Sequence, residues 1–282
     1  MANPYVLKQS KENRINIIDL TIIYSLVVAV FVGIAAGYLG SLMVLEKMAL
    51  VGDALSHVAL PGLAIGITLN FNPYIGAFAF LFISAVIIWH IQRTTKISFE
   101  ALVGAMFTLA LAIGILLYGD DLDALEAALF GDISQVSLIG ATAAIAISIT
   151  AILLTKLIYN RLVLAMISED LAVSKGIKVA QTNLLYLCLV SVVVAVGIQI
   201  VGTLLVGFLV IVPAIAAKII SANMAKYAVL SSIFGAVAAF FGVLLWSTFG
   251  FNLPFPGPIV VFVGIIIFVI SLVINWIYKL TT

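Results

Sequence analysis

The run TNLLYLCLVSVVVAVGIQIVGTLLVGFLVIVPAIAA, residues 182–217, decides the fold of this chain. It contains no Asp, Glu, Lys, Arg or His, and it is much longer than the roughly 20 apolar residues that cross a bilayer as one helix. Gln199 and Gly202 interrupt the run near its middle, where a turn would leave two short spans. We therefore expect two membrane-spanning helices in this run.

The rest of the chain has the same character. Hydrophobic residues make up 65% of the 282 residues and charged residues only 9%, whereas roughly a quarter of a soluble domain is charged. The chain is therefore predicted to be an all-α polytopic bundle, 1–282 forming one domain behind a polar segment at 1–17. About nine passes are expected, or eight if one is re-entrant, near 18–44, 49–69, 73–91, 98–118, 136–158, 182–200, 203–220, 227–249 and 258–277.

Basic residues predict which face is cytoplasmic. With nine alternating passes, ten of the thirteen Lys and Arg residues fall at one face, and only Lys8, Lys11 and Arg14 at the other. The richer face is predicted to be cytoplasmic, with the C-terminus inside. The segment Gly119–Asp132, rich in acidic residues, then lies outside. It is either an ordinary solvated loop or a docking surface or cation-collecting rim.

Several function classes are disfavoured by the sequence. A net charge of +1 gives no basic face for a nucleic acid. The chain has no G-x-x-x-x-G-K-[ST] phosphate loop and no nucleophile–base pair typical of an enzyme. If transport is driven by ATP, the hydrolysis must occur in a separate subunit.

Few ionisable residues lie inside the predicted spans, and one pair stands out. Asp53 and His57, within Val51–Gly62, are four residues apart, which places both side chains on one face of a helix. His57 lies about 15 Å along the helix from Lys47, near the middle of the bilayer. Pro61 has no N–H to offer the His57 carbonyl, so the helix should open there. Ionisable groups at this depth are costly, which favours a functional role.

A carboxylate and an imidazole together suit divalent Mn, Fe or Zn, and no thiolate accompanies them to favour Cu(I). Two ligands are too few to hold an ion well, but a two-fold dimer would bring two Asp and two His to its axis. The alternative is that Asp53 and His57 form a buried hydrogen bond that only fixes helix packing.

The segment 167–177 is predicted to be a short cytoplasmic helix with its own start and stop. Ser168 can cap its first turn, Glu169 and Asp170 suit its positive end, and Gly176 suits its C-terminus. Such a helix is either an ordinary interfacial connection or a rigid element that docks into a partner.

If the segment docks, three consecutive residues, Leu171, Ala172 and Val173, would offer a small apolar face to a groove in that partner. Buried apolar anchors dominate contacts of this kind, while a charged rim sets the orientation.

Seven short segments, in order along nearly the whole chain, form a further pattern. They are Glu46–Ala49, Gly52–His57, Leu129–Ile133, Glu169–Gly176, Val201–Leu205, Ile211–Ala214 and Pro256–Pro258. Together they resemble the membrane permease subunits of bacterial ABC importers for manganese, zinc or iron. One departure is the pair Glu46 and Lys47, where many members of that family carry two basic residues.

The resemblance implies a homodimeric permease in the bacterial inner membrane, two copies of a cytoplasmic ATP-binding subunit and an extracytoplasmic metal-binding protein. It implies that Asp53 and His57 line the metal pathway. It also implies coupling to the ATPase through the 168–176 segment, with Glu169, Asp170, Leu171, Ala172 and Gly176 as the contacting residues. No permanently bound cofactor is expected, because the Mn, Zn or Fe ion is the cargo.

Two other functions stay open at this point. A permease for iron chelates or cobalamin would need a roomy uncharged path, in which a midplane carboxylate and imidazole would be out of place. An ion-coupled secondary metal transporter would need no ATPase, so co-purification of an ATPase would distinguish it.

Overall fold

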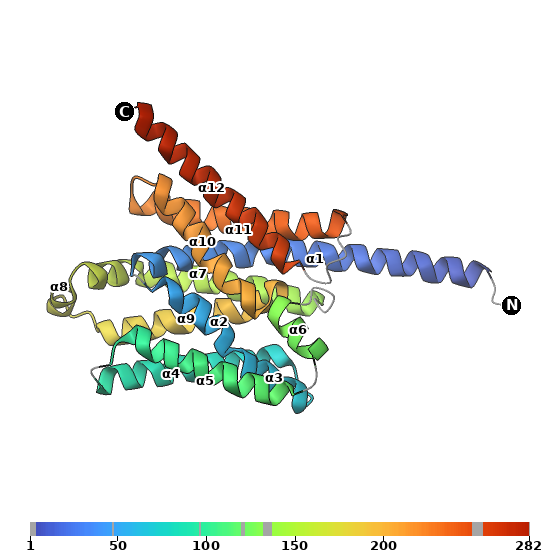
Figure 1. Cartoon of the computed structure of the whole chain (residues 1–282), viewed down its shortest axis with the longest axis horizontal. Coiled ribbons are helices and arrows are strands. Elements are labelled where there is room, and N and C mark those ends of the chain that lie inside the picture. The colour runs from blue at the N-terminus through green and yellow to red at the C-terminus, as the bar shows by residue number, and fades with distance from the viewer. Residues whose placement is uncertain are drawn as a thin grey trace.

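A computed structural model describes residues 4–46, 48–95, 97–119, 122–131, 137–249 and 256–281. Within these ranges the chain is helical and contains no strand (Figure 1). The helices are α1 (Pro4–Leu45), α2 (Ala49–Val58), α3 (Leu60–Thr68), α4 (Pro73–Thr94), α5 (Phe99–Tyr118), α6 (Leu122–Phe130), α7 (Leu138–Ile167), α8 (Glu169–Ser174), α9 (Val179–Val201), α10 (Thr203–Ile220), α11 (Met224–Phe249) and α12 (Gly257–Thr281).

Eight stretches of the described chain are long and apolar enough to cross a membrane. Seven of them lie in α1, α4, α5, α7, α9, α11 and α12, and the eighth, Val51–Thr68, combines α2 and α3. The helix α10 is shorter but runs in the same bundle (Figure 1). The predicted all-α polytopic architecture is confirmed, and the turn expected near Gln199–Gly202 is present at Gly202.

The two ends of the bundle differ in charge. The end that carries α8, at the left of Figure 1, also carries basic residues such as Arg93 and Lys218, in the last turns of α4 and α10. By the positive-inside rule we expect this end to be cytoplasmic and the α6 end to be external. Of the residues used to predict the two faces, Lys47, Lys96, Asp120, Asp121 and Asp132 lie outside the described residues.

Part of the external acidic segment was expected to be a loop, and the structure corrects this. Residues Leu122–Phe130 form the helix α6. Ala128 on this helix is buried, while Asp123 and Glu126 are exposed. The last residues of α6 lie against Gly202, so the helix is anchored on the turn between α9 and α10. The helix-forming residues Leu, Ala and Glu explain why this segment is not a loop.

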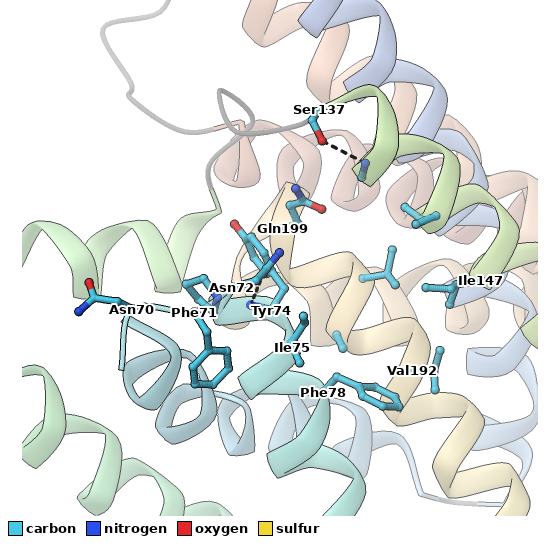
Figure 2. A pocket seen from close by; sticks show the side chains of 16 residues that line it. Asn70, Phe71, Asn72, Tyr74, Ile75, Phe78, Ser137, Ile147, Val192 and Gln199 are labelled. Carbon is cyan, nitrogen blue, oxygen red and sulfur yellow. Dashed lines mark hydrogen bonds between the residues drawn. The ribbon is translucent and has the colours of Figure 1, made fainter. Parts of the chain in front are cut away.

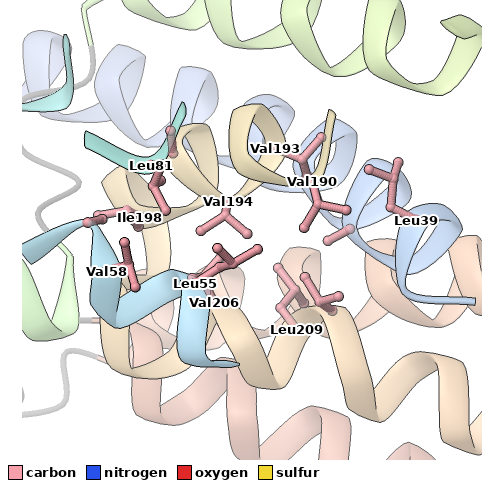
Figure 3. Packing of buried hydrophobic residues seen from close by; sticks show 14 of the residues in the cluster. Leu39, Leu55, Val58, Leu81, Val190, Val193, Val194, Ile198, Val206 and Leu209 are labelled. Atoms are coloured by element: carbon pink, nitrogen blue, oxygen red, sulfur yellow. The ribbon is translucent and has the colours of Figure 1, made fainter. Parts of the chain in front are cut away.

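The helices α2 and α3 form the centre of the protein. Of the span formed by α2 and α3, 72% is buried inside the protein, compared with 22% of the span in α12 at the edge of the bundle. In Figure 3, Leu55 and Val58 of α2 pack against Val206 of α10 and Ile198 of α9. The polar residues Ser56 and His57 of α2 are therefore buried inside the protein, and Asp53 is partly buried.

Close packing of small residues supports this arrangement. Gly33 of α1 and Gly235 of α11 approach so closely that a Cβ atom on either would overlap the backbone of the other. One turn away, the Ser231 hydroxyl donates a hydrogen bond to the Gly37 carbonyl. Small residues and interhelical hydrogen bonds are the usual means of helix association in lipid, where the hydrophobic effect between helices is absent.

Candidate metal pathway

The helix α2 carries both Asp53 and His57, one turn apart. It packs against α10 and α5, and more lightly against α1 and α9. Asp53 is half-buried, and His57 is only 9% exposed. The structure therefore places both predicted residues on one helix at the centre of the bundle.

His57 has an apolar neighbour and an available nitrogen. Its ring meets the ring of Phe107 on α5 edge to face, with 5.3 Å between the ring centroids. Its Nδ1 atom is buried and has no hydrogen-bond partner among the described residues. A buried polar atom without a partner costs roughly 1–3 kcal/mol, so it is a candidate ligand for a passing ion.

The helix is interrupted just after His57. The helix α2 ends at Val58 and α3 begins at Leu60, with Ala59 between them and Pro61 in the first turn of α3. The Ala59 N–H reaches the Ser56 carbonyl only at 3.4 Å. Because Pro61 lacks an N–H, the His57 carbonyl has no helical partner four residues on. The His57 carbonyl instead accepts a capping bond from a backbone N–H at the end of α2.

Asp53 is positioned by a glycine on another helix. A Cβ atom added to Gly207 of α10 would lie 2.6 Å from the Asp53 Cα atom and 2.8 Å from its Oδ1 atom. The missing side chain of Gly207 thus makes the space that the Asp53 side chain occupies. Sequence reasoning missed Gly207 and Phe107, because residue spacing on one helix says nothing about which residues of other helices face it.

Replacing Gly207 by Ala is expected to push α2 away from α10 and to displace the Asp53 carboxylate. Since a misplacement of about 1 Å can cost on the order of 100-fold in an active site, we expect metal uptake to fall at least about tenfold. Uptake of radioactive Mn²⁺ into cells measures the effect. The matched control is Gly104→Ala on α5, where an added Cβ meets nothing within 4 Å. Equal uptake by the two variants would contradict this role for Gly207.

The Asp53 and His57 side chains alone do not make a complete metal site. Among the described residues, no group of three or more His, Cys, Asp or Glu side chains could hold a metal ion. An aspartate and a histidine supply oxygen and nitrogen ligands of the kind that Mn²⁺, Fe²⁺ and Zn²⁺ accept. Further ligands have to come from the backbone, from water or from another copy of the chain.

The segment predicted to contact an ATPase forms the helix α8 at the cytoplasmic end. The Ser168 hydroxyl accepts a hydrogen bond from the Leu171 N–H at 3.2 Å, as the predicted cap requires. At the other end, the Ile177 N–H bonds to the Ala172 carbonyl and the Gly176 N–H to the Val173 carbonyl. Gly176 has a φ of 76°, so this C-terminal cap favours glycine.

One residue of α8 does not lie where the sequence analysis expected it. Ala172 is fully buried within its own chain, so it cannot line a surface offered to a partner. Leu171 and Val173 are exposed, at 44% and 59%. Glu169, Asp170 and Gly176 are exposed as well. A six-residue helix lying on α7 and α9 must turn one side inward, and its smallest apolar side chain takes that position.

Comparisons with known proteins were made for sequence and for structure. Residues 19–275 match the ABC 3 transport family. The manganese transport system membrane protein MntC of Listeria monocytogenes is 33% identical over 88% of both chains. The manganese import system permease protein ScaB of Streptococcus parasanguinis is 31% identical, also over 88% of both. The high-affinity zinc uptake system membrane protein ZnuB of Buchnera aphidicola is 27% identical over 83% of this chain and 90% of its own.

Two solved structures resemble the fold. The PsaBC complex of Streptococcus pneumoniae, solved with a Fab, contains a chain with a TM-score of 0.76 and 31% identity, covering 88% of this chain and 89% of that one. An inward-facing metal-chelate type ABC transporter gives a TM-score of 0.74 at 17% identity, covering 89% of this chain and 85% of that one. The second likeness concerns the fold alone.

Proposed function

The chain belongs to the ABC 3 transport family, and on this premise we propose that it is the membrane permease subunit of an ATP-driven importer of divalent transition metal ions. The observation that carries the proposal is the Asp53–His57 pair at the centre of a chain that matches this family over nearly its whole length. The protein is a multi-pass component of the cell membrane, and its own role is transport and not catalysis.

Manganese is the first candidate for the cargo. Two relatives above 30% identity are named for manganese transport or import, and a more distant one for zinc uptake. The chemistry agrees, because a carboxylate and an imidazole serve both ions and no thiolate favours copper. Iron, with the same ligand preferences, is a third candidate.

Each residue of α2 has a distinct role in the proposed passage. The Asp53 carboxylate offsets the charge of an ion that is losing its water shell, which is the main cost of moving it through hydrocarbon. The Nδ1 atom of His57 replaces one water ligand. The ring of Phe107 packs against one side of the imidazole.

A second copy of the chain completes the site in this proposal. The two ligand side chains of one chain are too few for an ion, and a two-fold axis beside α2 would double them to two carboxylates and two imidazoles. Alternating access then consists of the two copies opening this shared site first to the outside and then to the cytoplasm.

The proposed assembly includes two further proteins. A cytoplasmic ATP-binding subunit, in two copies, contacts α8 through the exposed side chains of Leu171 and Val173, with Glu169 and Asp170 on the rim. An extracytoplasmic metal-binding protein delivers the ion at the α6 end. The support for these partners is the family membership and the rigid capping of α8.

The function is tested by reconstituting the permease with its ATP-binding subunit in liposomes. We expect Mn²⁺ to accumulate only when ATP is present on the side of α8, and the ATP-binding subunit to co-purify with the permease in mild detergent. Liposomes that contain the permease alone are the control. Mn²⁺ uptake by the permease alone, driven by an ion gradient, would show a secondary transporter instead.

A further inference from the structure

A groove on the outer surface of the bundle lies apart from α2. It has a volume of about 730 Å³, and it is lined by the loop before α4, the first turns of α4 and α7, and the last turns of α9. The helices α4 and α7 each pack along α9, which forms the floor of the groove between them. All these segments lie at the external end.

The groove reaches from the membrane surface into the depth of the hydrocarbon. Its lining residue Ile147 is nine residues from the start of α7, and Val192 is nine from the end of α9. At 1.5 Å per residue this is roughly 13 Å, close to the thickness of one leaflet of the hydrocarbon core. Phe78, also in the lining, is 40% exposed at the bundle surface. The deep part is thus open to the bilayer, where a soluble partner does not reach.

Asn72, Ser137 and Gln199 lie at one end of the groove, together with apolar residues such as Phe71 and Ile75, whereas the other end is apolar. Figure 2 shows Asn72, Ser137 and Gln199 gathered at one end and Phe78, Val192 and Ile147 away from them. None of the described lining residues is charged. This polarity matches an amphiphile that has a neutral polar region at the membrane surface and a hydrocarbon chain below it.

The polar end offers hydrogen-bond donors. The Asn72 Oδ1 atom already accepts a bond from the Tyr74 N–H at 3.0 Å, and the Ser137 hydroxyl accepts one from the Gly140 N–H at 3.1 Å. One acceptor position of each is used to cap α4 and α7, and the Asn72 amide NH₂ and the Ser137 O–H remain able to donate. The Gln199 amide lies beside Gly140, 4.0 Å from where a Cβ atom would be. A ligand that pairs with these hydrogen-bond donors must carry acceptor oxygens at the same depth in the membrane.

We propose that this groove binds one glycerolipid of the outer leaflet. The ester oxygens of the lipid accept hydrogen bonds from Asn72, Ser137 and Gln199, and one acyl chain lies along α9. Ester groups sit at the boundary between hydrocarbon and headgroups, which is the level of these three residues. Because no Lys, Arg or His side chain lines the described part of the groove, the hydrogen bonds are to the ester region of the lipid and not to its phosphate.

The test is native mass spectrometry of the purified permease, titrated with diacyl phosphatidylglycerol and with its dialkyl ether analogue, which lacks the ester carbonyls. We expect the diacyl lipid to bind about three- to tenfold more tightly, as loss of one or two hydrogen bonds implies. In Gln199→Leu this difference should shrink. A neutral glycosyl diacylglycerol should bind within about twofold of phosphatidylglycerol.

A blocking variant gives an independent readout. Ala143 of α7 is an exposed lining residue, so Ala143→Phe should fill the groove without disturbing the core and should weaken lipid binding at least about tenfold. Ala146→Phe, at an exposed position of α7 outside the groove, is the matched control. Equal binding of the ester and ether lipids, a strong preference for the anionic headgroup, or wild-type binding by a folded Ala143→Phe protein would each overturn the proposal.

Discussion

Replacing Asp53 by Asn is expected to reduce ATP-driven Mn²⁺ uptake at least about 100-fold, the largest effect we foresee in this chain. Asn has nearly the same size, so packing against Gly207 is kept while the negative charge is lost. At this depth the ion has lost part of its water shell, and without the Asp53 carboxylate no negative charge offsets the charge of the ion. His57→Ala removes a ligand nitrogen and should have a similar effect.

Uptake and ATP hydrolysis should be measured together in liposomes that contain the permease and its ATP-binding subunit. The control is Ser56→Ala, a buried polar residue of the same helix whose hydroxyl only donates to the Asp53 carbonyl. We expect this control to transport within about threefold of the wild type. Normal uptake by both Asp53→Asn and His57→Ala would show that the ion does not pass this pair.

Replacing Leu171 by Asp is expected to separate the permease from its ATP-binding subunit. Leu171 is an exposed apolar side chain on a rigid, doubly capped helix, and such anchors carry much of the binding energy of an interface. Burying an unpaired carboxylate there costs about 3–5 kcal/mol, which is roughly a 100- to 4,000-fold loss of affinity. Co-purification in mild detergent measures this loss, and uptake should fall with it.

Leu171→Met keeps the apolar volume and is the matched control for this variant. Ala172→Trp is a different experiment, because Ala172 is buried within its own chain. We expect this variant to disturb the packing of α8 and not the partner's groove. If Leu171→Asp retains both the ATP-binding subunit and normal uptake, α8 is only a connection between α7 and α9.

Much of the fold could be predicted because the bilayer imposes simple rules. Charge-free runs and their Gly, Pro and Asn interruptions located the spans, and the turn at Gly202 was expected from a run too long for one helix. The caps of α8 were predictable for a related reason, since Ser168 and Gly176 satisfy backbone groups that local sequence alone defines.

The features that were missed depend on contacts between distant parts of the chain. Ala172 was assigned to the outer side of α8, because a six-residue helix does not reveal by periodicity which side is covered. Gly207, which leaves space for the Asp53 side chain, belongs to α10, and Phe107 belongs to α5. The spacing of residues along α2 does not predict which residues of other helices contact it. The helix α6 was read as a loop because its carboxylates obscured a short apolar side that packs near Gly202.

The central claim is that the ion in transit is bound by Asp53 and His57, and pulsed electron paramagnetic resonance of Mn²⁺ on the purified permease tests it most directly. The predicted spectrum shows nitrogen couplings from imidazole that disappear in His57→Ala. With two copies at one site, two equivalent nitrogens are expected. Bound Mn²⁺ without nitrogen coupling, or coupling unchanged in His57→Ala, would contradict the claim.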